Sequence, residues 1–299
     1  MEFKEKLQAY QEEINWRLAQ IAEVPEVPQK SVYTAMQYSL LAGGKRVRPV
    51  LTLAVADMLG ADHNAALEVG CALECIHTYS LIHDDLPCMD DDALRRGKPT
   101  CHMMFGEATA LLAGDGLLNL AAELLTAPSL SEHLMPAALL RTIHLIFSST
   151  GCRGMIGGQV MDLESEEQPE VTLDALTEMH NCKTGALIQA AALAGAYLTG
   201  DDPSAPEISK IGIFSSKLGL AFQIKDDILD CTGDVQTLGK QTGSDVRNQK
   251  NTFVTALGMD GAAAYLKQLT DEAVSALEIF DTRAAFLTAL AGYLLERRN

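Results

Sequence analysis

The chain has 299 residues, of which 47% are hydrophobic and 21% are charged, so it is long enough to bury a substantial core. Acidic residues outnumber basic ones by 40 to 23, and the formal net charge is −17. A surface this acidic argues against nucleic acid and anionic membranes as main partners, although divalent cations can still join carboxylates to a phosphorylated ligand. The seven cysteines include no CxxC pair, which favours a reducing, cytoplasmic location.

Helical periodicity predicts an all-α fold with few strands. Ala- and Leu-rich segments with a 3.6-residue period recur along the chain, whereas strand-like alternation bounded by Asn-Gly or Asp-Gly turns is absent. Proline and glycine residues separate these segments, and no shift in composition marks a domain boundary. We therefore expect one domain, residues 1–299, of roughly ten helices. The predicted helices cover residues 4–21, 30–42, 47–60, 63–84, 107–126, 132–150, 173–199, 205–231, 260–278 and 281–297.

Two segments are predicted to be linkers. Residues 164–170 are acidic, and residues 232–252 are polar and glycine-rich over a length typical of a functional or disordered loop. The first twenty residues alternate in charge and lack the apolar core of a signal peptide. The longest uncharged run, residues 184–200, is slightly shorter than the about 18 apolar residues of a membrane span, so we expect no span.

The segment LIHDDLPCMDDDALRRG (81–97) crowds five aspartates into nine residues and follows them with two arginines. Like charges this close repel by about 1 kcal/mol per pair even in a water-like dielectric, so a positive partner is expected between them. An apolar helical pattern leads into the segment, and Pro87 is expected to break that helix. The residues around the break can then bulge outward and return Asp90 to Asp84.

A second acidic cluster, FQIKDDILD (222–230), places Asp226 and Asp230 four residues apart on one helix face. Such a pair destabilises a helix unless a cation binds. A single acidic run is usually solvated surface charge, but two runs at helix ends with nearby cations favour metal binding. Carboxylates without Cys or His at ligand spacing suit Mg²⁺ better than zinc, and no EF-hand loop is present. Two such faces beside arginines indicate a diphosphate ligand.

Basic residues at a predicted helix start fit the same ligand. The segment GGKRVR (43–48) places Lys45 and Arg48 three residues apart, where a helix N-terminus already favours anions. It is not a Walker A loop, because Arg46 stands where Ser or Thr is required. Taken alone, the segment is equally consistent with a solvated turn.

Four segments in this order resemble the trans-isoprenyl diphosphate synthases: GGKRVR (43–48), DDLPCMDDDALRRG (84–97), KTG (183–185) and FQIKDDILD (222–230). The resemblance covers nearly the whole chain and is closest to the bacterial farnesyl diphosphate synthases (geranyltranstransferases). It implies a homodimer whose helices surround a central cavity. It also implies head-to-tail condensation of isopentenyl diphosphate with dimethylallyl and then geranyl diphosphate, which gives (2E,6E)-farnesyl diphosphate.

The resemblance implies a role for each matching residue. Aspartates would hold three Mg²⁺ ions, or Mn²⁺ in their place, on the allylic diphosphate: Asp84, Asp90 and Asp226, helped by Asp85, Asp227 and Asp230. Three cations would bind the allylic diphosphate: Arg95, Lys183 and Lys240. Three others would bind the diphosphate of isopentenyl diphosphate: Lys45, Arg48 and Arg96. His77 would lie at the edge of this second pocket. For a lone histidine, a satisfied core position is otherwise the more frequent role. Oxygen atoms of two residues would face the allylic cation: Thr184 and Gln223.

Product length is less determined by the sequence. Family members with an aromatic residue five positions before the first aspartate motif tend to stop at fifteen carbons, and Tyr79 stands there. Helical periodicity instead places Ser80 more directly beneath Asp84, and ordinary core packing of Tyr79 remains open. The DDxxxxD spacing also occurs in plant-type geranylgeranyl synthases, so a geranylgeranyl or geranyl product is an alternative. Two remoter alternatives are a terpene cyclase, which would lack the second aspartate motif, and a non-catalytic partner subunit, which would lose one motif.

Overall fold

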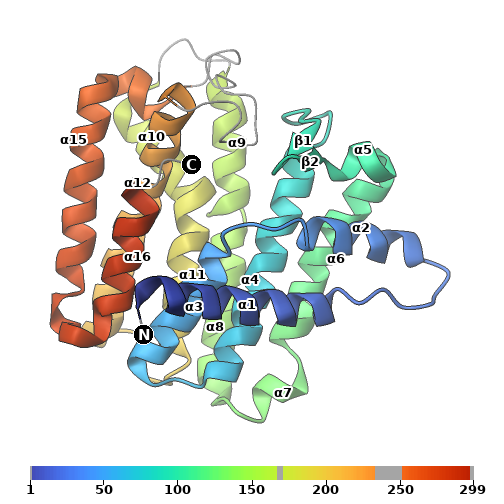
Figure 1. Ribbon diagram of the computed structural model, residues 1–299, viewed down its shortest axis with the longest axis horizontal. Helices are drawn as coiled ribbons and strands as arrows, with labels where there is room; N and C mark the ends of the chain where they lie inside the picture. The colour runs from blue at the N-terminus through green and yellow to red at the C-terminus, as the bar shows by residue number, and fades with distance from the viewer. Residues whose placement is uncertain (1, 167–170, 233–250, 297–299) are drawn as a thin grey trace.

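The helices predicted from the sequence are present in a computed structural model that describes residues 2–166, 171–232 and 251–296 (Figure 1). A two-stranded hairpin, β1 (Leu94–Arg95) and β2 (Lys98–Pro99), is the only sheet in these ranges. The α-helices are α1 (Phe3–Ile21), α2 (Lys30–Leu40), α3 (Val47–Leu59), α4 (His63–Asp84), α5 (Cys101–Phe105), α6 (Glu107–Leu125), α7 (Pro128–Ser131), α8 (Pro136–Thr150), α9 (Met155–Glu166), α10 (Leu173–His180), α11 (Ala186–Tyr197), α12 (Pro206–Thr232), α15 (Phe253–Ala276) and α16 (Ala285–Glu296). A π-helical segment (Asn181–Gly185) joins α10 to α11, and a 3₁₀ segment (Glu278–Ala284) precedes α16. The all-α fold is confirmed.

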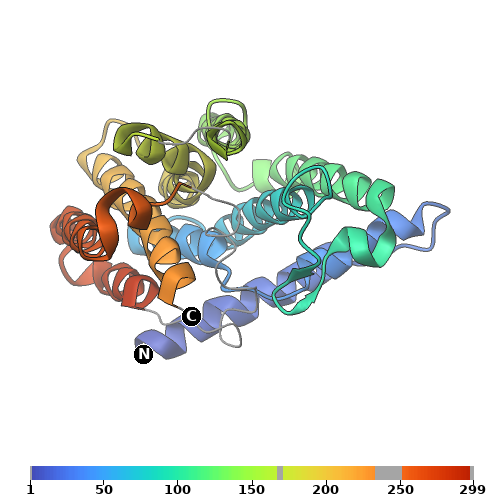
Figure 2. The same cartoon turned by 90° about the horizontal axis from the view of Figure 1, so that it is seen from above.

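Helices α3, α4 and α11 form the centre of the molecule and carry many of its fully buried side chains. In Figure 1, α12, α15 and α16 lie at one side of this centre, and α2, α5 and α6 lie at the other. From above, the cyan α4 and the green α6 run side by side, away from the orange-red α15 and α16 (Figure 2). Small residues allow this packing, since an added Cβ on Gly195 would lie 2.4 Å from the Thr52 carbonyl oxygen.

The ends of α3 and α4 follow from local sequence. Gly60 ends α3 in the left-handed conformation, with φ of 77°, which glycine adopts without steric cost. Two residues later, the Asp62 carboxylate accepts a hydrogen bond from the Ala65 N–H at 2.8 Å and caps α4. This tight connection directs α4 back through the core.

Helix α9 corrects the sequence-based prediction, which treated Gly157 and Gly158 as helix breakers and residues 164–170 as a linker. Both glycines lie inside α9, and the helix continues to Glu166. A side chain at Gly158 would collide with the backbone of the π-helical segment, because an added Cβ would lie 2.1 Å from the Lys183 nitrogen. The glycine therefore permits close helix packing rather than a turn.

Other boundaries differ by smaller amounts. The predicted helix 173–199 is divided by the π-helical segment, and the predicted helix 132–150 begins at Pro136. Helix α15 starts seven residues before the predicted 260 and contains a break at Gly258, where φ is 71°. Most of the predicted linker 232–252 lies outside the described residues. One domain over residues 1–299 stays a prediction.

Two helical stretches are long and apolar enough to cross a membrane, judged by length and composition alone. They are α4 and residues Glu107–Ser131, whose most apolar windows are 78% and 33% buried within the protein. A core helix passes the same test, and α4 is such a helix. The absence of a membrane span stays a prediction.

Candidate active site

A cavity of about 1590 Å³ lies among α4, α6, α9, the π-helical segment and α12. It brings together the acidic and basic motifs, although Lys45 and Asp230 are 185 positions apart in the chain. The predicted site residues that line it are Lys45, Arg48, His77, Tyr79, Ser80, Asp84, Arg95, Arg96, Lys183, Thr184, Gln223, Asp226, Asp227 and Asp230. Among the described residues, Asp85 and Asp90 do not line it. Lys240 lies outside the described residues.

The first aspartate motif begins at the last residue of α4. The chain then turns back, as the proline predicts, and the Asp90 N–H donates a hydrogen bond of 2.9 Å to the Asp84 carbonyl oxygen. The pKa of the Asp84 carboxyl is raised, mainly by burial and also by the charge of Asp90. The charge of Lys183 opposes this shift but does not cancel it. The backbone contact returns Asp90 to the end of α4, and the Asp90 charge is felt at the Asp84 carboxyl, which is a suitable setting for a divalent cation.

Asp85, the second aspartate of the motif, is buried and holds an arginine. Its Oδ1 atom accepts a hydrogen bond of 2.8 Å from Arg95 Nε, and Asp92 approaches the same guanidinium at 3.3 Å. Burial lowers the pKa of Arg95, but its bond with Asp85 outweighs this effect and raises it. Asp85 thus holds the Arg95 guanidinium at the cavity wall. A role for Asp85 in metal binding stays a prediction.

The second aspartate motif lies on α12, on the other side of the cavity. Asp230 Oδ2 is buried and receives no hydrogen bond within the described part of the chain. Asp227 differs from it, because Oδ1 accepts from Gln223 Nε2 at 3.0 Å and Oδ2 accepts from the Phe253 N–H at 2.8 Å. Asp227 therefore ties α12 to the start of α15 and orients the Gln223 amide. Its metal-binding role also stays a prediction.

The π-helical segment presents Lys183 and Thr184 to the cavity. Thr184 Oγ1 donates a hydrogen bond of 3.2 Å to Gln223 Oε1, and both residues line the cavity. Lys183 Nζ lies 2.6 Å from Asp162 Oδ2 on α9. Because this ion pair is only partly exposed, it holds the lysine more firmly than a surface pair would.

Sequence reasoning missed two polar residues of α9. Gln159 lines the cavity, its Nε2 atom is buried without a hydrogen-bond partner among the described residues, and Asp162 pairs with Lys183. They stand three residues apart in the otherwise apolar segment MIGGQVMDL (155–163). That spacing places both on one helix face and could have indicated a site, had α9 been expected as a helix.

A second group of cations, Lys45, Arg48 and Arg96, also lines the cavity. Gly43 and Gly44 have φ of 94° and 130°, and the Arg96 guanidinium lies where a Gly44 side chain would be, 2.7 Å from the ideal Cβ position. Arg96 also donates a hydrogen bond to the Gly43 carbonyl oxygen. Burial lowers the pKa of Arg48 to about 10, and its Nε atom has no hydrogen-bond partner in the described ranges. This group is suited to an anion.

His77 lines the same cavity and is held neutral. Burial lowers the pKa of its imidazole well below the usual value, and the neighbouring Arg48 and Arg96 lower it further. A neutral imidazole can donate one hydrogen bond to an anion without adding charge.

Tyr79 and Ser80 both line the cavity. Tyr79 is only 6% exposed, its ring packs edge-on against His83 with centroids 5.7 Å apart, and its hydroxyl has no hydrogen-bond partner in the part of the chain described. The Ser80 hydroxyl donates to the His77 carbonyl oxygen at 2.9 Å within α4. Of the two, the tyrosine supplies the larger apolar surface to the cavity.

The donor set fits magnesium. The candidate ligands are aspartate oxygens from α4 and α12, and Asp230 contributes a buried oxygen that has no donor among the described residues. Among the described residues, no three Asp, Glu, His or Cys side chains lie close enough to hold an ion by themselves. Magnesium is commonly bound by one or two carboxylates, with water and substrate phosphate completing the shell, so a split carboxylate set agrees with that mode.

Comparisons with known proteins agree with this arrangement. The sequence matches the family described as polyprenyl synthetase over residues 29–281. It is 49% identical to a farnesyl diphosphate synthase of Bacillus subtilis over 78% of this chain and 77% of that protein. It is 42% identical to one of Escherichia coli over the full length of both. A solved FPP/GFPP synthase from Zymomonas mobilis superposes with a TM-score of 0.88 at 36% identity, covering 98% of each chain. The chain belongs to the polyprenyl synthetase family.

Proposed function

We propose that the protein is a farnesyl diphosphate synthase. It condenses isopentenyl diphosphate with dimethylallyl and then geranyl diphosphate to give (2E,6E)-farnesyl diphosphate. The observation that carries the proposal is one cavity lined both by aspartates of α4 and α12 and by five cations, Lys45, Arg48, Arg95, Arg96 and Lys183. Two anionic substrates are thereby given separate places beside a shared apolar space.

The allylic diphosphate belongs between the aspartate motifs. Asp84, Asp90, Asp226 and Asp230 would hold Mg²⁺ there, which when bound stabilises the negative charge of the leaving diphosphate. Arg95, fixed by Asp85, and Lys183, fixed by Asp162, add positive charge from the protein. Both cations are held before substrate arrives, so little reorganisation accompanies breakage of the C1–O bond.

The allylic cation that remains must be stabilised and kept from water. The Thr184 and Gln223 oxygens direct partial negative charge toward it, and Asp227 holds the glutamine in that orientation. The apolar wall below excludes water that would otherwise add to the cation. The double bond of isopentenyl diphosphate then attacks C1, a proton leaves its C2 for the departing diphosphate, and the new double bond forms.

The isopentenyl diphosphate belongs at the cation group formed by Lys45, Arg48 and Arg96. Arg48 carries a buried Nε atom without a partner among the described residues, which a phosphate oxygen would satisfy. Neutral His77 would donate a hydrogen bond at the edge of the same pocket. The two substrates then lie with their reacting carbons toward the shared apolar space.

A direct assay tests the proposal. The purified protein is incubated with Mg²⁺, labelled isopentenyl diphosphate and geranyl diphosphate, and the released prenyl alcohols are sized by chromatography. Fifteen-carbon product that disappears on chelation of the metal is the expected result. A product of ten or twenty carbons would assign a geranyl or geranylgeranyl synthase instead, and absence of incorporation would contradict catalysis by this chain.

We further infer that the protein acts as a cytoplasmic homodimer. Large apolar side chains are exposed on neighbouring helices α5 and α6, among them Met103, Met104 and Leu112. Exposed apolar side chains on adjoining helices are typical of an interface, and a second copy of the chain is the occupant that the family resemblance implies.

A further inference from the structure

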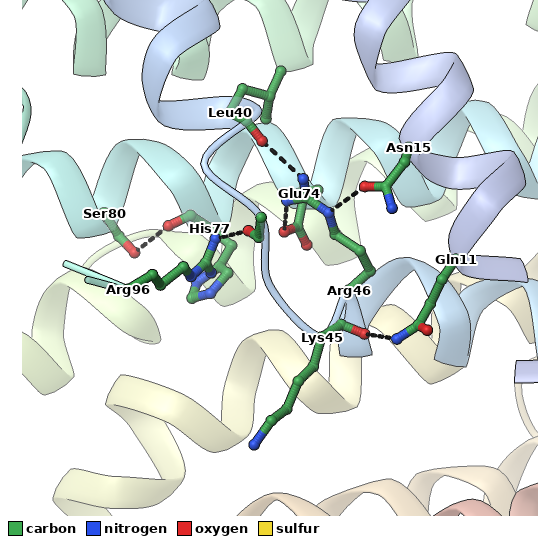
Figure 3. A network of polar contacts seen from close by, with 10 residues as sticks. Gln11, Asn15, Leu40, Lys45, Arg46, Glu74, His77, Ser80 and Arg96 are labelled. Atoms are coloured by element: carbon green, nitrogen blue, oxygen red, sulfur yellow. Dashed lines mark hydrogen bonds and ion pairs between the residues drawn. The ribbon is translucent and has the colours of Figure 1, made fainter. Parts of the chain in front are cut away.

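A buried ion pair lies directly behind the cations of the isopentenyl pocket. Arg46 and Glu74 have side chains only 1% and 2% exposed, and Arg46 Nη1 lies 2.8 Å from Glu74 Oε1. The other guanidinium donors are also satisfied, since Nε donates to Asn15 Oδ1 and Nη2 to the Leu40 carbonyl oxygen, both at 2.9 Å. Figure 3 shows the guanidinium at the meeting point of α1, α2 and α4.

The backbone is arranged so that Arg46 points inward while Lys45 does not. Arg46 has φ of 53°, an unfavourable conformation for a residue with a side chain, and Gln11 Nε2 holds the Lys45 carbonyl oxygen at 2.9 Å. In Figure 3 the Lys45 side chain extends away from the ion pair. The turn thus sends one cation to Glu74 and leaves Lys45 for the pocket.

Glu74 is close enough to affect the pocket arginines as well. It borders the same cavity as Arg48 and Arg96, and it lies one helical turn before His77 on α4. Its charge raises the pKa of Arg48 and of Arg96, although burial lowers both to a greater extent. Among the described residues, Arg46 is the one cation that is hydrogen-bonded to this carboxylate.

A buried carboxylate without a counter-ion is strongly unfavourable, so it would recruit the nearest mobile cation. The candidates are Arg48, whose Nε atom has no partner in the described ranges, and Arg96 on the hairpin. Either arginine, once paired with Glu74, would be less available to a diphosphate.

We propose that Arg46 is an internal counter-ion that keeps Glu74 from capturing Arg48 and Arg96, and so preserves the pocket for the diphosphate of isopentenyl diphosphate. Arg46 is therefore a positioning residue that touches no substrate. The inference rests on the proposed function, because it concerns one of the two substrates of that reaction.

Arg46→Met tests the inference by leaving Glu74 without its partner. The expected result is a KM for isopentenyl diphosphate raised by about tenfold or more, with the KM for geranyl diphosphate changed less than about threefold. The double variant R46M/E74Q removes the buried charge too, and its KM for isopentenyl diphosphate should return to within about threefold of the original value. A double variant as impaired as R46M would overturn the inference, and so would an unchanged KM in R46M.

E74Q alone separates this role from mere support of the turn. Gln at position 74 can still accept a hydrogen bond from Arg46 but carries no negative charge, so the KM for isopentenyl diphosphate should stay at or below the original value. A raised KM would show that the ion pair acts only by shaping the turn, and this criterion decides the matter even if R46M does not fold.

Arg17→Met is the matched control. Arg17 and Glu68 form another ion pair between α1 and α4, at 2.6 Å, and neither residue lines the cavity. R17M should lower the thermal unfolding temperature without changing either KM. Turnover by the unmodified enzyme is measured first: its absence would overturn the proposed function, whereas normal turnover with an unchanged R46M would overturn this inference alone.

Discussion

Gly158 is the residue at which α9 comes closest to the backbone of Lys183. In Gly158→Ala, the added methyl carbon would lie 2.1 Å from the Lys183 nitrogen and 2.5 Å from its Cα, so one backbone must move. We expect a loss of about 1–3 kcal/mol in the free energy of unfolding and a fall in kcat, because Lys183 is displaced. Urea unfolding and steady-state kinetics check both expectations.

Gly292→Ala is the control for that substitution. Gly292 lies in α16, and an added Cβ would meet no atom within 4 Å among the described residues. Alanine is the better helix former by about 1 kcal/mol, so this variant should be as stable or more stable, with kcat unchanged. An undiminished kcat in G158A would contradict the proposed packing role.

Tyr79 is the residue expected to limit product length. Tyr79→Ala should lengthen the prenyl product beyond fifteen carbons, because the removed ring opens space in the apolar wall of the cavity. Tyr79→Phe should leave product length unchanged, since the hydroxyl makes no hydrogen bond within the described chain. Sizing of the prenyl alcohols from both variants is the measurement, and identical products from Y79A and the unmodified enzyme would mean that Tyr79 is ordinary core packing.

The sequence predicted which segments form the site, but it did not predict which side chains and backbone groups each aspartate contacts. The return of Asp90 to Asp84 followed from Pro87 alone, because a proline must end the helix. The contacts of Asp85 and Asp227 could not be foreseen, since their partners Arg95 and Phe253 are brought to them by tertiary packing. Adjacent aspartates in one motif thus face different partners.

At the scale of elements, α9 is the main failure of sequence reasoning. Two adjacent glycines lower local helix propensity, and only the packing of α9 against the π-helical segment explains why they are needed there. Long helices with an uninterrupted period, such as α4 and α12, were predicted to within a residue or two. Asp162 was missed because its helix was missed.

A charged contact between elements gives a prediction about pH. His63 joins three helices, with Nδ1 at 2.8 Å from Asp57 Oδ1 on α3 and Nε2 at 3.0 Å from Glu13 Oε2 on α1. Burial lowers the pKa of His63, but the hydrogen bonds with Asp57 and Glu13 outweigh this effect and raise it. The stabilisation is therefore complete below the unfolded-state pKa of about 6.5 and is lost as the pH rises through the higher folded-state pKa.

We expect the free energy of unfolding to decrease modestly, by less than about 1 kcal/mol, between pH 6 and pH 8.5, because these groups are partly exposed. His63→Gln should remove that component of the pH dependence. Urea titrations of both proteins at the two pH values provide the comparison. Tyr10 is the other titratable group that contacts Asp57, and it is present in both proteins. An equal decrease in both proteins would rule out His63 as its source.

At the scale of the whole molecule, the exposed apolar side chains of α5 and α6 lead to a prediction about assembly. Leu112 is 57% exposed in the single chain, so Leu112→Glu should place a charge in the proposed dimer interface. Light scattering after size exclusion should then give a mass near that of one chain, 32.2 kDa, instead of twice that value. Ile279→Glu changes an exposed isoleucine of the 3₁₀ segment before α16 and should remain dimeric. Retention of the dimer by L112E would place the interface elsewhere.

The guanidinium of Arg96, seated beside Gly44, also bears on how the enzyme is synthesised. The two residues bonded there, Gly43 and Arg96, are 53 positions apart, so a ribosome releases the glycine turn well before the arginine that completes it. A nascent chain that ends before the hairpin therefore lacks Arg96 beside the glycine turn, and it should bind diphosphates weakly. Affinity for isopentenyl diphosphate should consequently not arise before Arg96 has been synthesised and has docked, and it would serve as a reporter of correct docking between the two segments.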